Sequence, residues 1–170
     1  MLAEAFFGRP SLKVAEALLG KYLVRRIGDV EIAAMIHETE AYIGPEDLAC
    51  HASKGRTPRT DVMFGPAGVW YVYFCYGIHW MLNIVTDGED HPSAVLLRGA
   101  GDWTGPARLT KAMSIDKTLN GQPATLASGL WIEDRGVRIA KGKIERTPRI
   151  GVDYAGEWAA RPYRFLTQPK

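Results

Sequence analysis

Cysteine is scarce in this chain of 170 residues, which contains only Cys50 and Cys75. The two cysteines do not form a CxxC pair, and the four histidines are not spaced like zinc ligands. Neither a disulfide framework nor a thiolate metal site is indicated. We therefore expect a protein without metal or cofactor that folds in a reducing, cytoplasmic environment.

Long apolar runs are also missing. No uninterrupted stretch approaches the ~20 residues that a membrane span requires. The first twenty residues, MLAEAFFGRPSLKVAEALLG, have no basic region ahead of their apolar ones. Membrane insertion and export are therefore not expected.

A strong overall charge is absent too, because the net charge is only +2. Its distribution is uneven: acidic side chains outnumber basic ones in residues 1–97, and the reverse holds in residues 98–170. The second half could bind the phosphates of a nucleic acid. A solvated surface with uneven charge explains the pattern equally well.

The composition is that of a folded protein, with 46% hydrophobic residues, five Trp and seven Tyr. The length fits a single domain over residues 1–170, and a monomer is the default. Two strands joined by Gly28-Asp29 predict a hairpin, and the later strands follow one another in the same way. This succession predicts an α+β (mixed α/β) fold in which a curved, largely antiparallel β-sheet is flanked by helices.

Two helices are expected, over residues 11–19 and 104–113, with Ser11 and Thr104 as their N-caps. A polar stretch over residues 44–61 predicts a long loop, and such loops commonly bind or gate a ligand. The strands are expected at residues 22–27, 31–42, 69–76, 79–86, 94–99, 130–133 and 137–140.

The strand that ends in ETEAY carries the first candidate site. Strand alternation puts Glu38, Glu40 and Tyr42 on one face, with alternate residues ~6.6 Å apart. A carboxylate beside an aromatic ring at the rim of a sheet can activate water against a substrate that stacks on the ring. A charge that keeps an edge strand from pairing is the alternative interpretation.

Two polar residues interrupt apolar strands, Arg98 in AVLLRG and Asn83 in MLNIV. Buried polar groups need partners, and Glu40 would suit Arg98. A purely structural ion pair would look the same from the sequence. Among the many aromatic residues, most of which we expect to pack, Tyr76 before Gly77 is the best candidate for an exposed ring that enters a base stack.

Taken together, these residues resemble the alkyladenine (3-methyladenine) DNA glycosylase family. The resemblance covers nearly the whole chain in ordered, correctly spaced blocks. The blocks are ETEAYIGPEDLACH (38–51), RTPR (56–59), MFGPAGVWYVYFCYG (63–77), LNIV (82–85), VLLR (95–98), GPARL (105–109) and GEWAARPYRF (156–165).

The resemblance implies two catalytic residues. Glu40 matches the general base that activates the attacking water, and Arg98 matches the arginine that helps to hold that water and the carboxylate. A neighbouring arginine favours the ionised glutamate, whereas a nearby Glu38 would oppose it. No lysine stands in these blocks, so we expect neither a Schiff base nor strand cleavage.

The resemblance also implies how the damaged base is bound. Tyr42, His51 and Tyr73 match the residues that sandwich the flipped base, and their electron-rich rings would favour cationic alkylated purines. Asn83 matches the side chain that crowds the 2-amino position of guanine. Tyr76 matches the ring that fills the gap left in the duplex.

The predicted function is therefore DNA base-excision repair. The enzyme would flip an alkylated or deaminated purine, such as 3-methyladenine, 7-methylguanine, hypoxanthine or ethenoadenine, out of double-stranded DNA and hydrolyse its N-glycosidic bond, leaving an abasic site. Candidate phosphate ligands, each explained equally well by solubility, are Arg56, Arg59, Arg108, Lys111, Arg161 and Arg164.

Three rival interpretations are compatible with parts of the sequence. Glu38 and Glu40 could be the paired acids of an inverting sugar hydrolase, but that interpretation leaves His51, Asn83 and Arg98 unexplained. A zinc base deaminase would need HxE and PCxxC elements, which the chain lacks. A non-catalytic nucleic-acid-binding module with stacking aromatics remains the alternative, although it gives Glu40 and Arg98 no role.

Overall fold

The computed structural model describes residues 1–168, so the last two residues of the expected domain lie outside the described residues. Over this range the chain forms a nine-stranded sheet with central order β3-β4-β5-β2-β1-β7, and every strand pairing is antiparallel. The expected α+β class with an antiparallel sheet is confirmed. Within the described residues no helix is long and apolar enough to cross a membrane.

The strands are β1 (Tyr22–Ile27), β2 (Val30–Tyr42), β3 (Trp70–Cys75), β4 (His79–Thr86), β5 (Ser93–Ala100), β6 (Trp103–Thr104), β7 (Leu130–Glu133), β8 (Glu145–Thr147) and β9 (Arg164–Leu166). The α-helices are α1 (Glu4–Phe7), α2 (Ser11–Leu18) and α3 (Pro106–Ala112). Short 3-10 helices are η1 (His51–Lys54), η2 (Asp61–Phe64), η3 (Lys117–Leu119), η4 (Leu126–Ser128), η5 (Lys141–Lys143) and η6 (Asp153–Ala160).

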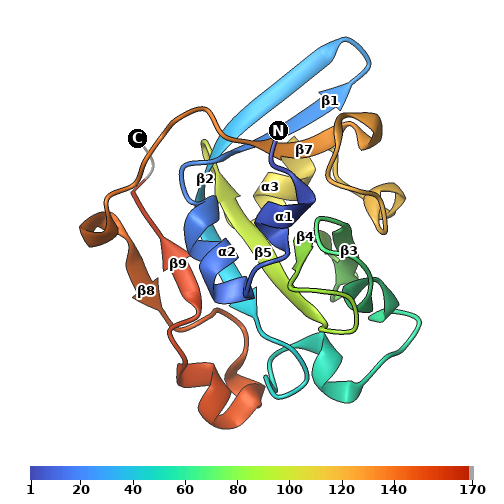
Figure 1. Ribbon diagram of the computed structural model, residues 1–170, viewed down its shortest axis with the longest axis vertical. Coiled ribbons are helices and arrows are strands. Elements are labelled where there is room, and N and C mark those ends of the chain that lie inside the picture. Colours follow the sequence, from blue (N-terminus) through green and yellow to red (C-terminus); the bar gives the residue numbers. More distant parts are fainter. Residues whose placement is uncertain (169–170) are drawn as a thin grey trace.

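Strand β2 organises the sheet because it is 13 residues long and pairs along both edges. One edge bonds to β1 along its first half and to β9 at residues 38–40, while the other edge bonds to β5. In Figure 1, β2 and β5 run side by side through the centre of the molecule, and the β1–β2 hairpin projects from it. The hairpin at Gly28-Asp29 is therefore confirmed.

The helices cover one face of this sheet. Their buried side chains pack in one apolar cluster with alternate residues of the central strands, including Val72, Leu82 and Val95. Each fully buried aliphatic side chain contributes about 1.5–3 kcal/mol to stability. Because successive strand residues point to opposite faces, the residues between them face away from the helices. That second face carries the polar site and is partly covered by the loop over residues 44–61.

Both expected N-caps are wrong. Pro10 is the N-cap of α2 and Ser11 is its first residue, with a buried hydroxyl that finds no partner among the described residues. Gly105 is the N-cap of α3, because Thr104 belongs to β6 and pairs with Gly99. Pro fits the first turn of α3 as expected. At α3 the pairing of Thr104 with Gly99 outweighs its local capping preference.

The expected strand over residues 137–140 is also wrong. Its burial alternates residue by residue as in a strand, and Val137 and Ile139 lie close to Gly20. The segment nevertheless joins no ladder. The alternating sequence pattern therefore predicted correctly which side chains of this segment pack. A strand also needs a free sheet edge beside it.

We predict that Gly99→Ala destabilises the protein by about 1–3 kcal/mol, the usual cost of overpacking. An added methyl group at this position in β5 would overlap the ring of buried His37. Urea denaturation would measure the change in the free energy of unfolding. Gly142→Ala is the matched control, because nothing lies within 4 Å of the added methyl group. Equal stabilities of the two variants would contradict this account of the β2–β5 contact.

Candidate active site

The register of the sheet brings the candidate residues together. Tyr71 of β3 pairs with Asn83 of β4, Asn83 with Leu96 of β5, and Leu96 with Glu40 of β2. Directly paired residues on antiparallel strands share a face. Four strands thus contribute one row of side chains to the face that the helices leave uncovered.

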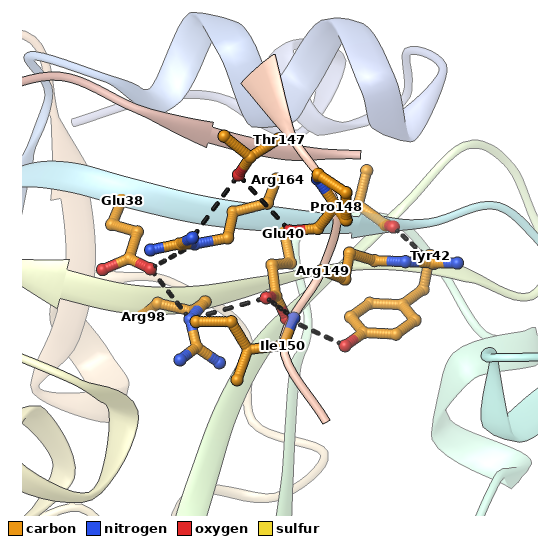
Figure 2. A network of polar contacts seen from close by, with 10 residues as sticks. Glu38, Glu40, Tyr42, Arg98, Thr147, Pro148, Arg149, Ile150 and Arg164 are labelled. Atoms are coloured by element: carbon orange, nitrogen blue, oxygen red, sulfur yellow. Dashed lines mark hydrogen bonds and ion pairs between the residues drawn. The ribbon is translucent and has the colours of Figure 1, made fainter. Parts of the chain in front are cut away.

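A network of carboxylates and guanidinium groups lies at one end of this row (Figure 2). Arg98 Nε donates to Glu38 Oε1 at 2.9 Å and lies 3.5 Å from Glu40 Oε1. The pairing of β2 with β5 is irregular at Glu38, and both glutamates reach the same arginine. Glu40 is thus a partner of Arg98 as expected, but Glu38 is the closer one.

Arg164 belongs to the same network. Its Nε donates to Glu38 Oε1 at 2.7 Å, and only part of its side chain is accessible. The sequence suggested Arg164 as a phosphate ligand, and this position gives it a carboxylate partner inside the protein. Glu38 is consequently bonded by two arginines, which offset its repulsion of Glu40.

The carboxylate of Glu40 is completely buried, with 0% of its side chain accessible. The backbone N–H of Ile150 donates to Oε1 at 2.8 Å, and the hydroxyl of Tyr42 donates to Oε2 at 2.9 Å. Burial raises the pKa of Glu40 above its ordinary value, and Arg98 and these two hydrogen bonds act in the opposite direction. The site therefore holds a glutamate whose affinity for a proton is increased.

Aromatic side chains form a cluster next to Glu40. Tyr42 and Tyr73 both pack against one apolar group that includes Tyr71. The ring of His51 lies 4.7 Å from that of Tyr73, and its Nδ1 is 2.9 Å from the hydroxyl oxygen of Tyr71. Asn83 Nδ2 donates to the carbonyl of Tyr71 at 3.1 Å. The residues expected to bind the base are thus assembled beside the expected catalytic carboxylate.

Tyr71 belongs to the aromatic residues that the sequence predicts to pack, and no binding role was predicted for it. It is buried, and it links His51 to Asn83 through its hydroxyl and carbonyl oxygens. Its position two residues before Tyr73 on one strand face was the available signal. Burial lowers the pKa of His51 to about 4, with further contributions from Arg59 and Lys54. The imidazole is therefore neutral at physiological pH.

Tyr76 lies on the turn between β3 and β4, and 85% of the residue is exposed. Its φ of +50° is followed by +68° at Gly77, and Ile78 N–H donates back to the carbonyl of Cys75 at 3.0 Å. Two left-handed residues in succession make a tight turn that suits the twist of the strands. The turn therefore projects a large ring into solvent, as its position in the sequence predicted.

The other basic candidates are dispersed. Arg59 lies over the ring of Tyr73 at 4.9 Å, whereas Arg56 is ion-paired with Asp61 at 2.6 Å. Arg161 lies over Trp158 at 5.2 Å. Arg108 and Lys111 are exposed on α3, which packs against the face of the sheet opposite to Glu40. Of these residues, only Arg59 is brought into the aromatic cluster.

Metal ligands do not gather here. No group of three or more His, Cys, Asp or Glu side chains that could hold a metal ion occurs within residues 1–168. Both cysteines are free thiols, and burial raises the pKa of Cys50 to about 11. Cys50 is therefore protonated and packs as a small apolar residue.

The fold and the site define an α+β enzyme with a buried carboxylate beside clustered aromatic rings. Comparison with known proteins identifies the family, because the methylpurine-DNA glycosylase family matches residues 5–102 and 101–170. The chain belongs to this family and is a DNA glycosylase. The non-catalytic binding module and the sugar hydrolase considered above are therefore wrong.

Individual relatives support the assignment of the chain to this family. A protein of Myxococcus xanthus is 48% identical over 173 residues, covering 96% of this chain and 88% of its own. A protein of Methanocella arvoryzae is 46% identical over 186 residues, covering 97% and 91%. One of Legionella pneumophila strain Corby is 47% identical over 171 residues, covering 96% and 92%. Each carries the provisional name 3-methyladenine DNA glycosylase.

We predict that Arg59→Gln raises the pKa of His51 from about 4, because it removes the positive charge that opposes protonation of the imidazole. Burial remains, so the pKa stays below the ordinary value of 6.5. NMR titration of the histidine ring protons would measure it. Arg56→Gln serves as the control because that side chain is engaged by Asp61. An unchanged titration of His51 in Arg59→Gln would rule out the coupling.

Proposed function

We propose that this glycosylase removes alkylated and deaminated purines, the 3-methyladenine class, from double-stranded DNA, using Glu40 as the general base for a water molecule. One observation carries the proposal. Both oxygens of a fully buried glutamate are bonded by fixed donors, and the glutamate lies beside a cluster of aromatic rings. The names of the relatives quoted above support the substrate class.

The reaction balances without a cofactor. Water forms a bond from its oxygen to C1′ of the deoxyribose, and a proton passes to Glu40. The C1′–N9 bond breaks, and its electron pair leaves with the base. A cationic alkylated purine departs as a neutral base, which makes it a good leaving group. Arg98, 3.5 Å from Glu40, would hold the water and favour the ionised carboxylate.

Tyr42, His51 and Tyr73 would sandwich the flipped base. A neutral His51 does not repel a cationic purine and can still form a hydrogen bond. Guanidinium groups lie over Tyr42 and Tyr73, at 4.7 and 4.9 Å. Each of these two rings already has a cation on one face. The binding of the base would therefore depend more on the stacking area than on cation–π attraction. Neutral lesions such as hypoxanthine and ethenoadenine fit such a site as well. Asn83 would exclude the 2-amino group of guanine.

Tyr76 would occupy the gap that the flipped nucleotide leaves. Extrusion of a base costs a few kcal/mol, and an inserted ring offsets part of that cost. The exposed Ile78 stands beside it on the same turn. Arg56, Arg59 and Arg161 would bind phosphates nearby. The absence of strand cleavage, the monomeric state and the cytoplasmic location stay predictions from the sequence.

We predict that Glu40→Gln lowers the single-turnover rate of base release by about 10²- to 10⁴-fold, as expected for loss of a general base. Duplexes that carry one 3-methyladenine-type lesion, ethenoadenine or hypoxanthine would be assayed for free base and for alkali-labile sites. The dissociation constant for the lesion duplex should change little. Glu31→Gln, in the exposed part of β2, is the control. Borohydride should trap no covalent complex with DNA.

Base release from none of the three lesions by the wild type would contradict the proposed substrates. Wild-type activity in Glu40→Gln would contradict the role of the glutamate. A trapped covalent complex would instead indicate an amine nucleophile and strand-cleaving chemistry.

We further predict that Tyr42→Phe moves the acid limb of the rate profile to higher pH. The Tyr42 hydroxyl stabilises the ionised carboxylate of Glu40, so its loss raises the pKa of Glu40. The base is active only when ionised, and therefore a higher pH is needed for half of the maximal rate. Single-turnover rates from pH 4 to 8 would be compared with Tyr22→Phe as the control. An unshifted acid limb would show that the bond does not tune Glu40.

A further inference from the structure

A buried ion pair lies directly behind the site. The side chains of Asp47 and Arg149 are both 0% accessible. Arg149 Nη1 donates to Asp47 Oδ2 at 2.5 Å, and Nη2 donates to Oδ1 at 2.8 Å. The guanidinium also donates to the carbonyls of Ala41 at 2.9 Å and Trp158 at 3.3 Å. One side chain thereby ties together the end of β2, the loop after it, η6 and its own segment.

Stability alone is a weak reason for this arrangement. Removing two charges from water is costly, and an apolar pair of similar volume is often as stable. Asp47 is also used locally, because it accepts from the backbone N–H groups of Ala49 at 3.0 Å and Ile43 at 3.3 Å. Arg149 Nε is buried and finds no acceptor within the described residues. The function of the pair is therefore better explained by the residues that it contacts than by its contribution to stability.

Arg149 contacts one donor to Glu40 and directly precedes the other in the chain (Figure 2). Its guanidinium carbon lies 4.7 Å from the centre of the Tyr42 ring, and the hydroxyl of Tyr42 bonds to Oε2 of Glu40. The residue that follows, Ile150, bonds through its N–H to Oε1. Fixing Arg149 therefore fixes the ring on one side of the carboxylate and the backbone donor on the other.

We propose that Arg149, held by Asp47, is a positioning residue that sets the geometry of Glu40 and Tyr42. The inference rests on the proposed role of Glu40 as the base. Because the guanidinium takes one face of Tyr42, a flipped base stacks on the other face. The aspartate makes the position of the arginine rigid, since a bidentate pair has one orientation.

The charged and polar groups that face Glu40 come from four segments. Strand β2 contributes Glu38 and Tyr42, β5 contributes Arg98, and β9 contributes Arg164. The segment before η6 contributes the charge of Arg149 and the N–H of Ile150. Only the Tyr42 and Ile150 donors depend on Arg149. Their loss would favour the protonated carboxylate and move the acid limb of the rate profile upward.

The test replaces the pair by apolar residues, Asp47→Leu with Arg149→Met, which leaves no lone buried charge. Urea denaturation, single-turnover base release from pH 4 to 8, and the dissociation constant for a lesion duplex would be measured. We expect a folded but less stable protein, because the backbone groups bonded by Asp47 and Arg149 lose their partners. We also expect base release slower by about 10- to 100-fold and an acid limb at higher pH. The dissociation constant should change much less. Glu16→Leu with Arg146→Met, an accessible ion pair elsewhere, should match the wild type.

A wild-type rate and acid limb in the folded double variant would overturn the inference. If the double variant fails to fold, Arg149→Lys decides, because lysine keeps the charge but forms neither the bidentate bond nor the planar contact with Tyr42. A slower rate and shifted acid limb in folded Arg149→Lys would support the inference, and full activity would overturn it.

The parallel Glu40→Gln variant separates the two proposals. If Glu40→Gln is active, the proposed role of Glu40 as the base is wrong, and the inference about Arg149 loses its premise. If Glu40→Gln is inactive and the double variant is fully active, only the proposed role of Arg149 is wrong.

Discussion

The complete burial of the Glu40 carboxylate is the constraint on which the site depends. A carboxylate without water must find partners in the protein. Here they are two donors, the hydroxyl of Tyr42 and the N–H of Ile150, and one ion-pair partner, Arg98. Each donor comes from a different part of the chain. The sheet register, the bulge at Glu38 and the segment before η6 must all be correct before Glu40 can be charged and in position.

The same constraint explains the arginines around the site. Glu38 would repel Glu40, but Arg98 and Arg164 both bond to it. Asp47 and Arg149 neutralise each other while they hold the donors to Glu40. The charges therefore balance within a small volume, and Glu40 retains an increased affinity for a proton because of its burial. A general base benefits from such a pKa.

The two faces of the sheet have different roles, one in stability and the other in the site. The helical face buries the main apolar cluster and stabilises the fold. The opposite face can then hold polar groups whose burial is costly. The exposed turn at Tyr76 joins the ends of β3 and β4. A stable scaffold with binding groups on its loops and strand ends is a common arrangement for enzymes.

Local sequence predicted β1 to β5 and β7, the β1–β2 hairpin and the exposed turn at Tyr76, since periodicity and turn residues act over a few positions. It did not predict the short strands β6, β8 and β9. The local pattern also made Glu40, Tyr42 and Arg98 candidates, and their catalytic and binding roles stay predictions. Only the tertiary structure decided that Arg98 bonds more closely to Glu38, that Arg164 faces inward, and that residues 137–140 join no ladder. It alone brought Asp47 to Arg149, 102 residues away. Such contacts depend on register, bulges and free edges, which involve residues distant in sequence and leave no local periodic pattern.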